Sequence, residues 1–157
     1  PFYGKYDLLG EFKPDSHFAA FMTEKVFPGP RETHDRLWRA MHPASHVQRL
    51  DAADAPPFFV LHGTHDELIP LDEARWFVGC LRAGYAGEVV YAEVPHAHHG
   101  WDVPHSLRAD LTVEALQRYL ELQYARWCGR HGVTPTPAAP ASAASTATAS
   151  VEQAGTA

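Results

Sequence analysis

The stretch Pro56–Pro70, PPFFVLHGTHDELIP, decides which fold this chain is expected to adopt. Its core, Phe58–Leu61, is an aromatic and branched run that is too short for a typical helix and lacks the alternation of a half-exposed strand. Such a strand is buried on both faces, which is typical of a parallel sheet. Gly63 permits a sharp exit, so Asp66 lies just beyond the carboxyl end of the strand, where open α/β sheets bind ligands. Asp66 is therefore the first candidate for function, although an Asp in such a turn often only hydrogen-bonds its own backbone.

The residues after this stretch complete a unit of strand, helix and strand. Asp72 is the expected N-cap of a helix that runs to Ala83 and stops at Gly84. One face of this helix carries apolar residues at helical spacing, namely Ala74, Phe77, Val78 and Leu81. Glu88–Val94 is the next expected strand, and a right-handed crossover places it parallel to Phe58–Leu61.

The segments before the central strand are shorter and less regular. Pro1–Tyr3 has the character of the end of a strand, which puts a third sheet element at the start of the chain. Ala19–Lys25 and Thr33–Met41 are expected to be short helices, and Ala44–Ala55 is expected to be a connector into the central strand. The fold class is therefore α/β, with three strands of a mostly parallel sheet and flanking helices.

A long helix and a tail of low complexity end the sequence. The helix is predicted over Ser106–Trp127. Its expected buried face consists of Val113, Leu116, Leu120, Tyr124 and Trp127. Beyond His131 the composition collapses to Ala, Pro, Ser and Thr without periodicity. We therefore expect residues 1–130 to form the folded domain and residues 131–157 to be a disordered tail.

Composition and charge bound the class of protein. The chain has 157 residues, of which 45% are hydrophobic, which is enough for the core of one domain. Its formal net charge of −6 and the lack of clustered Lys and Arg argue against a nucleic-acid partner. No run of about 18 apolar residues predicts a membrane span. Cys80 and Cys128 have no metal-binding or redox spacing, so cysteine usage leaves the compartment undecided, with the cytoplasm favoured.

Two loops with titratable side chains follow the two parallel strands. Asp66 comes after the first strand, and the cluster HAHHGWD, residues 96–102, comes after the second. Adjacent parallel strands bring such loops side by side. An Asp beside a His is the orienting half of a nucleophilic triad, because the carboxylate fixes the tautomer of the imidazole and stabilises its protonated form. The order of acid, then histidine, then a final helix agrees with that reading.

On these motifs, residues 1–130 resemble the carboxyl-terminal half of an α/β-hydrolase of the esterase and lipase branch, similar to hormone-sensitive-lipase-like and feruloyl-esterase-like enzymes. HGTHDELIP resembles the acid loop of that family, and VPHAHHGWD resembles its histidine loop. The resemblance implies that Asp66 is the triad acid and that His99, followed by Gly100 and Trp101, is the base, with His98 as the competing register. It also implies hydrolysis of small-molecule carboxylic esters without a cofactor.

The sequence departs from this family at the nucleophile. The family pattern is G-x-S-x-G, yet none of the eleven glycines is followed two positions later by Ser or Cys. Ser16, Ser45 and Ser106 are the serines ahead of the tail, and none of them follows a strand through a tight glycine turn. We therefore expect the nucleophile to belong to an amino-terminal half that is missing from this chain. The chain alone is expected to be inactive.

Three other readings remain open at this stage. His62, His65 and Asp66 are residue types that hold zinc, so a metal-dependent hydrolase or a metal-binding module is a rival class. A peptidase of the same fold uses the same pair of acid and histidine. A non-catalytic relic would keep the fold as a binding surface and show no hydrolysis even with the missing half restored.

Overall fold

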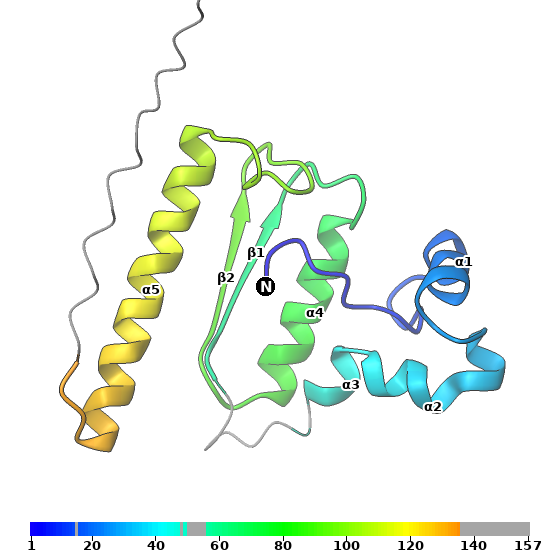
Figure 1. The fold of residues 1–157 in the computed structure, drawn as a ribbon, viewed down its shortest axis with the longest axis horizontal. Helices are drawn as coiled ribbons and strands as arrows, with labels where there is room; N and C mark the ends of the chain where they lie inside the picture. The colour runs from blue at the N-terminus through cyan, green and yellow to red at the C-terminus, as the bar shows by residue number, and fades with distance from the viewer. Residues whose placement is uncertain (15, 48, 50–55, 136–157) are drawn as a thin grey trace, which may run out of the picture. The chain divides into compact units, whose positions relative to one another are not determined.

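The computed structural model describes residues 1–14, 16–47, 49 and 56–135 (Figure 1). Within these residues the elements are, in order, α1 (Ser16–Lys25), α2 (Arg31–Met41), α3 (Ala44–Val47), β1 (Phe58–Gly63), α4 (Leu71–Gly84), β2 (Val89–Val94) and α5 (Leu107–His131). The chain forms two compact units, and the second begins at Leu120, within α5. The predicted tail lies outside the described residues from position 136 onward, as does the second half of the predicted connector, residues 50–55. The first four residues of that connector form the short helix α3 instead.

The parallel sheet is present as predicted. β1 and β2 pair in parallel from Phe58 opposite Val89 to Gly63 opposite Val94. On its other edge, β1 bonds to the start of the chain, because the Leu61 N–H donates to the Pro1 carbonyl at 2.9 Å and the Leu61 carbonyl accepts from the Tyr3 N–H at 3.1 Å. β1 therefore lies between the opening residues and β2.

The opening residues are shorter as a sheet element than the predicted strand. Phe2 forms a single parallel bridge with Leu61. Tyr3 has a φ angle of +32°, which takes the chain out of the extended conformation directly after the bridge. The third strand of the prediction is thus reduced to one bridge.

A cluster of buried apolar residues lies between α4 and β1. Ala74, Phe77, Val78 and Leu81 are all buried, which confirms the predicted face of α4. They pack with Val60 of β1 and with other buried residues, namely Tyr6, Val47 and Tyr85. Burying a side chain such as Val60 contributes about 1.5–3 kcal/mol, so this face of α4 is a main source of stability.

The start of α4 differs from the prediction. The helix begins at Leu71, and its N-cap position is occupied by Pro70, which makes no side-chain capping bond. Asp72 lies in the first turn, where a carboxylate interacts favourably with the helix dipole, and it pairs with Arg75 at 3.1 Å. Proline supplies the extended residue before the helix, so the chain does not need Asp72 as its cap.

The predicted buried face of α5 is wrong. Val113, Leu120, Tyr124 and Trp127 are exposed, and only Leu116 of the predicted set is partly buried. Leu111 and Leu122 lie on the opposite side of the helix from Val113 and are exposed as well, so the apolar residues of α5 do not define one stripe. Within the first unit, Tyr119 packs its ring against Phe59 of β1 at 4.9 Å. No helix in the described ranges is long and apolar enough to cross a membrane.

Two buried carboxylates fix the segment between the opening residues and α1. The Oε1 atom of Glu73 accepts the backbone N–H groups of Tyr6 and Asp7, both at 2.8 Å, and its Oε2 atom pairs with Lys5 at 2.7 Å. Asp7 in turn accepts three backbone N–H groups, from Glu11, Phe12 and Lys13. Burial opposes the charged form of Asp7, but these three donors outweigh it and hold the pKa of the carboxyl below its ordinary value of 3.8.

Asp7→Asn is expected to lower the free energy of unfolding by about 1–3 kcal/mol near pH 7, because an amide cannot accept all three N–H groups on two oxygens. The folded pKa of Asp7 is lowered, so its contribution is present above the ordinary value and is lost as the pH falls through the folded value. Urea unfolding of both proteins should show a smaller difference near pH 3 than near pH 7. Asp35→Asn, which weakens two exposed ion pairs, to Arg31 and Arg39, is the matched control and should change little. A pH-independent difference at Asp7 would contradict this account.

Candidate active site

The loop after β1 holds Asp66 in a buried position. The Oδ1 atom of Asp66 accepts the backbone N–H groups of Leu68 at 3.0 Å and Ile69 at 2.8 Å. His62, near the end of β1, is fully buried, and its Nε2 atom lies 2.8 Å from the Ile69 carbonyl. This contact joins the two ends of the loop. The backbone-binding role expected of an Asp in a turn is therefore real, and it uses one of the two carboxylate oxygens.

The loop after β2 is bonded directly to the loop after β1. The His65 N–H donates to the Ala97 carbonyl at 2.9 Å, and the His96 N–H donates to the Thr64 hydroxyl at 2.8 Å. At Gly63 the two loops come so close that an added Cβ would meet the carbonyl group of Ala97, at 2.8 Å from its carbon. The two loops thus form one structural unit at the carboxyl ends of the strands (Figure 1).

This unit brings Asp66 and His99 together. The Nδ1 atom of His99 lies 2.9 Å from Oδ2 of Asp66 and 3.2 Å from Oδ1. A carboxylate accepts hydrogen bonds and does not donate them, so Nδ1 carries the proton and Nε2 of the neutral ring holds a lone pair. The Asp66 side chain is fully buried, whereas that of His99 is 32% exposed. A buried carboxylate that fixes the tautomer of a partly accessible imidazole is suited to proton transfer.

His98 points elsewhere. Its Nδ1 atom lies 3.0 Å from both carboxylate oxygens of Glu67, and both side chains are largely exposed. The hydrogen bond from His98 holds the pKa of the Glu67 carboxyl below its ordinary value. The sequence left His98 as an alternative to His99 for the base. The two histidines have different partners, and His99 is the one beside Asp66.

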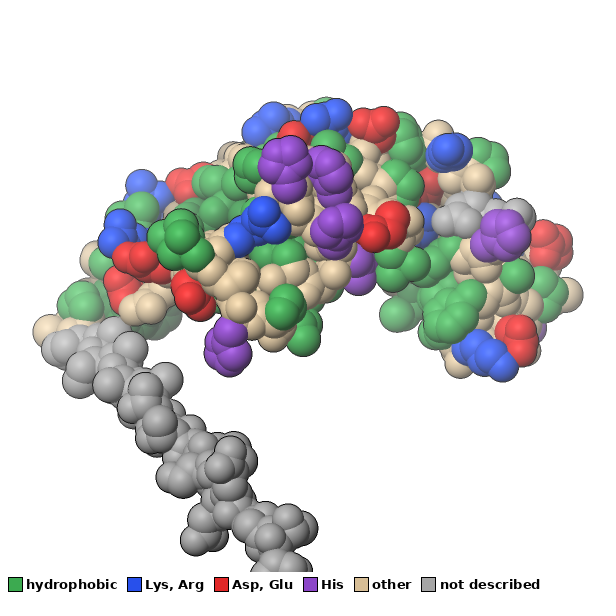
Figure 2. Space-filling model, turned by 90° about the horizontal axis from the view of Figure 1, so that it is seen from above, with side chains coloured by type: hydrophobic (Ala, Val, Ile, Leu, Met, Phe, Trp, Pro, Cys, Tyr) green, Lys and Arg blue, Asp and Glu red, His purple; other side chains and the backbone are tan. Residues whose placement is uncertain are grey.

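Figure 2 shows several histidine side chains close together on the face that it draws, with others apart from them. The His65 ring lies 4.8 Å from that of His96 and 6.0 Å from that of His98. Among the described residues, however, no group of three or more His, Cys, Asp or Glu side chains is arranged to hold a metal ion. Of the predicted alternative ligands, His62 Nε2 lies 3.5 Å from Oδ2 of Asp66 and 2.8 Å from the Ile69 carbonyl, whereas the ring of His65 lies against those of His96 and His98.

The hydroxyls of Ser45 and Ser106 are engaged away from His99. Ser106 lies just before α5, and its hydroxyl accepts the Ala109 N–H at 3.1 Å. Ser45 lies in α3, with its hydroxyl 2.8 Å from Nδ1 of the buried His42. Ser16 is the first residue of α1.

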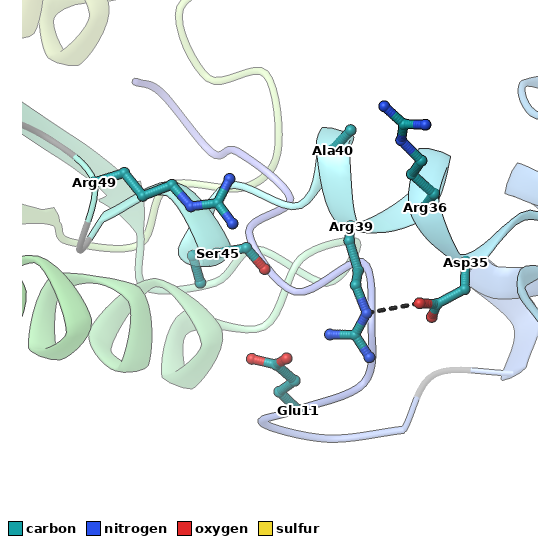
Figure 3. Close-up of a pocket in the computed structure, with 8 residues that line it drawn as sticks. Glu11, Asp35, Arg36, Arg39, Ala40, Ser45 and Arg49 are labelled. Carbon is teal, nitrogen blue, oxygen red and sulfur yellow. Dashed lines mark hydrogen bonds and ion pairs between the residues drawn. The ribbon is translucent and has the colours of Figure 1, made fainter.

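Ser45 also lines a pocket of about 730 Å³ beside α2 and α3. Figure 3 shows Arg39 in this pocket, held by Asp35 through a hydrogen bond of 2.7 Å. α3 lies near the amino end of β1, at the other end of the strands from the loops that carry Asp66 and His99 (Figure 1). The pocket therefore contributes nothing to the pair of Asp66 and His99.

Two residues near the pair were missed by the sequence analysis. Tyr3 packs its ring 4.5 Å from that of His99, and its hydroxyl donates to Oδ1 of Asp102 at 2.9 Å. The predicted strand at Pro1–Tyr3 contained the signal that could have found this contact, because a parallel neighbour of β1 ends at the same edge of the sheet as Asp66.

The chain is similar to esterases of Mycobacterium tuberculosis (strain ATCC 25618 / H37Rv). It is 35% identical to the esterase LipQ over 143 residues, which are 90% of this chain and 33% of LipQ. It is 38% identical to the probable carboxylic ester hydrolase LipM over 127 residues, which are 80% of this chain and 28% of LipM. The chain thus spans about a third or less of the length of the curated relatives that it matches. No model of a known protein family matches it.

A solved structure supports the same fold. Esterase 2 of Thermogutta terrifontis, determined with butyrate bound, matches with a TM-score of 0.51 and 21% sequence identity, over 87% of this chain and 44% of that chain. At this identity the likeness concerns the fold, which is that of part of an α/β-hydrolase.

Gly63→Ala is expected to destabilise the protein by about 1–3 kcal/mol and to separate the two loops, because the new methyl group meets the Ala97 backbone rather than a flexible side chain. Gly79→Ala is the matched control, since a Cβ at that position of α4 has no neighbour within 4 Å. In a helix interior this exchange should be neutral or stabilise by up to about 1 kcal/mol. Thermal unfolding of both variants measures the contrast, and equal midpoints would show that the close approach at Gly63 is not a constraint.

Proposed function

Because the chain is a relative of the mycobacterial esterases and has part of the α/β-hydrolase fold, we propose that it supplies the general base and the orienting acid of a serine-type carboxylic ester hydrolase. The observation that carries this proposal is the contact of 2.9 Å between His99 Nδ1 and the buried Oδ2 of Asp66. His99 is the base in this scheme, and Asp66 is the carboxylate that orients it.

The chemistry follows from the tautomer that Asp66 selects. The Nε2 atom of His99 takes the proton of a serine hydroxyl while the hydroxyl oxygen attacks the ester carbonyl carbon, and Asp66 stabilises the imidazolium that forms. His99 then gives the proton to the departing alcohol, which leaves an acyl-enzyme. In the second half of the cycle His99 deprotonates water, the water oxygen attacks the acyl carbon, and the serine oxygen recovers the proton as the acid is released.

We assign the nucleophile to a part of the gene product outside residues 1–157. Support comes from Ser45 and Ser106, whose hydroxyls are hydrogen-bonded to His42 and to the Ala109 N–H rather than to His99. The relatives are about three times as long as this chain, which leaves ample length for a nucleophile and an oxyanion hole. The substrates are small-molecule carboxylic esters, and the butyrate held by the similar esterase makes a butyrate ester the natural first substrate.

In the complete gene product that contains this chain, Asp66→Asn and His99→Ala are each expected to reduce kcat for p-nitrophenyl butyrate hydrolysis by about 10³–10⁴, because the base is lost or held in the wrong tautomer. His98→Ala removes a neighbouring histidine whose hydrogen-bond partner is the exposed Glu67 rather than Asp66, and it should change kcat by less than about threefold.

The same assay tests the rival classes. Activity that a chelator abolishes, or that falls equally in the His98 and His99 variants, would contradict the proposed roles. Hydrolysis of an anilide of the same acyl group without hydrolysis of the ester would instead favour a peptidase.

A further inference from the structure

Tyr3 contacts the histidine loop at three residues. Its ring lies 4.5 Å from the imidazole of His99 and meets the indole of Trp101 edge-on at 5.1 Å. Its hydroxyl donates to Oδ1 of Asp102 at 2.9 Å. These contacts join the first residues of the chain to the loop after β2, across 99 positions of sequence in the case of the hydrogen bond.

The backbone of Tyr3 is held in a conformation that an aromatic residue rarely adopts. Its φ angle is +32°, in the left-handed region that favours glycine. The surroundings enforce this conformation, because the Tyr3 N–H donates to the Leu61 carbonyl at 3.1 Å and Phe2 packs its ring on Trp101 at 5.7 Å. Strained residues that the surrounding structure holds in place are concentrated at functional sites.

We propose that Tyr3 is a positioning residue for His99, because its ring packs against the imidazole. The hydrogen bond from Tyr3 to Asp102 sets the angle of the Tyr3 ring. This inference rests on the proposed function. The bond from His99 Nδ1 to Asp66 fixes one edge of the imidazole, but the ring can still tilt about that bond, and the tilt moves Nε2. A ring packed against the imidazole limits the tilt, so Nε2 keeps the direction in which it must receive a proton.

The phenol of Tyr3 is suited to this role. Burial raises its pKa, and so do the hydrogen bond to Asp102 and the negative charges of Asp102 and Asp66. Tyr3 therefore remains a neutral donor at neutral pH and does not itself take up the proton of a nucleophile. Its effect on the reaction passes through His99.

The test compares variants of the complete gene product. Tyr3→Phe and Asp102→Ala each remove the hydrogen bond and keep the aromatic ring, whereas Tyr3→Leu removes the ring. Tyr91→Phe is the matched control, because it also breaks a tyrosine bond to a carboxylate, that of Glu93 at 3.0 Å, but in the middle of β2. Circular dichroism establishes that each variant is folded.

The first readout does not depend on activity. With ¹⁵N-labelled histidine, the proton on Nδ1 of His99 gives an NMR signal that broadens when the ring becomes mobile and the proton exchanges with water. We expect Tyr3→Leu to broaden this signal most, Tyr3→Phe and Asp102→Ala to broaden it partly and equally, and Tyr91→Phe to leave it unchanged. A wild-type line width in Tyr3→Leu would overturn the proposal. If Tyr3→Leu does not fold, a wild-type line width in both Tyr3→Phe and Asp102→Ala would overturn it.

The second readout is the kinetics of p-nitrophenyl butyrate hydrolysis. A lost positioning contact should lower kcat by about 10- to 100-fold in Tyr3→Leu and leave KM within about twofold. The double variant Tyr3→Phe/Asp102→Ala should lose no more than either single variant, because both remove one hydrogen bond. Additive losses of kcat in the double variant, or a change in KM without a change in kcat, would contradict the proposal that Tyr3 positions His99 through its bond to Asp102. A wild type that hydrolyses no ester but shows the expected NMR pattern would refute the proposed function and leave the positioning of His99 by Tyr3 intact.

Discussion

The parallel pairing of β1 on both of its edges is the constraint on which the rest of the structure depends. Leu61 bonds to Pro1 and Tyr3 on one side, and the register of β1 with β2 runs from Phe58 to Gly63 on the other. Parallel strands end at the same edge of a sheet, so the residues that follow Phe2, β1 and β2 lie close together at that edge. Without this pairing neither the acid loop nor the ring of Tyr3 would meet His99.

Backbone N–H groups hold the buried carboxylates of the described residues, and at Glu73 they do so together with the cation of Lys5. Glu73 and Asp7 each accept backbone donors, and Asp66 accepts two through Oδ1. A buried charge is tolerated when such bonds replace its hydration. At Asp66 the two carboxylate oxygens have different partners. Oδ1 accepts the N–H groups of the loop, and Oδ2 makes the shorter contact to His99. The same bonds that stabilise the acid loop therefore direct Oδ2 of Asp66 toward His99.

The sequence predicted those parts of the fold in which local pattern and tertiary packing agree. The uninterrupted apolar run of β1 and the single apolar face of α4 were both recognisable, and the order of the loops predicted that Asp66 lies beside the histidine cluster. The family resemblance favoured His99 within that cluster, and the roles of both residues remain a proposal. The face of α5 was not predictable, because its apolar residues surround the helix. The contact of Tyr3 was missed because it depends on one bridge between segments far apart in sequence.

The choice between His98 and His99 illustrates how burial resolves what spacing leaves open. Asp66 and Glu67 are consecutive in the sequence, as are His98 and His99. Asp66 pairs with His99, and Glu67 pairs with His98. Both contacts are about 3 Å long, but the pair of Glu67 and His98 is exposed on both sides, and such pairs contribute little to stability. The register is instead held by the buried contacts, the approach of Gly63 to Ala97 and the pair of Asp66 and His99. A slip of one residue would place His98 at the buried carboxylate and break both contacts, so packing at Gly63 selects the histidine that Asp66 binds.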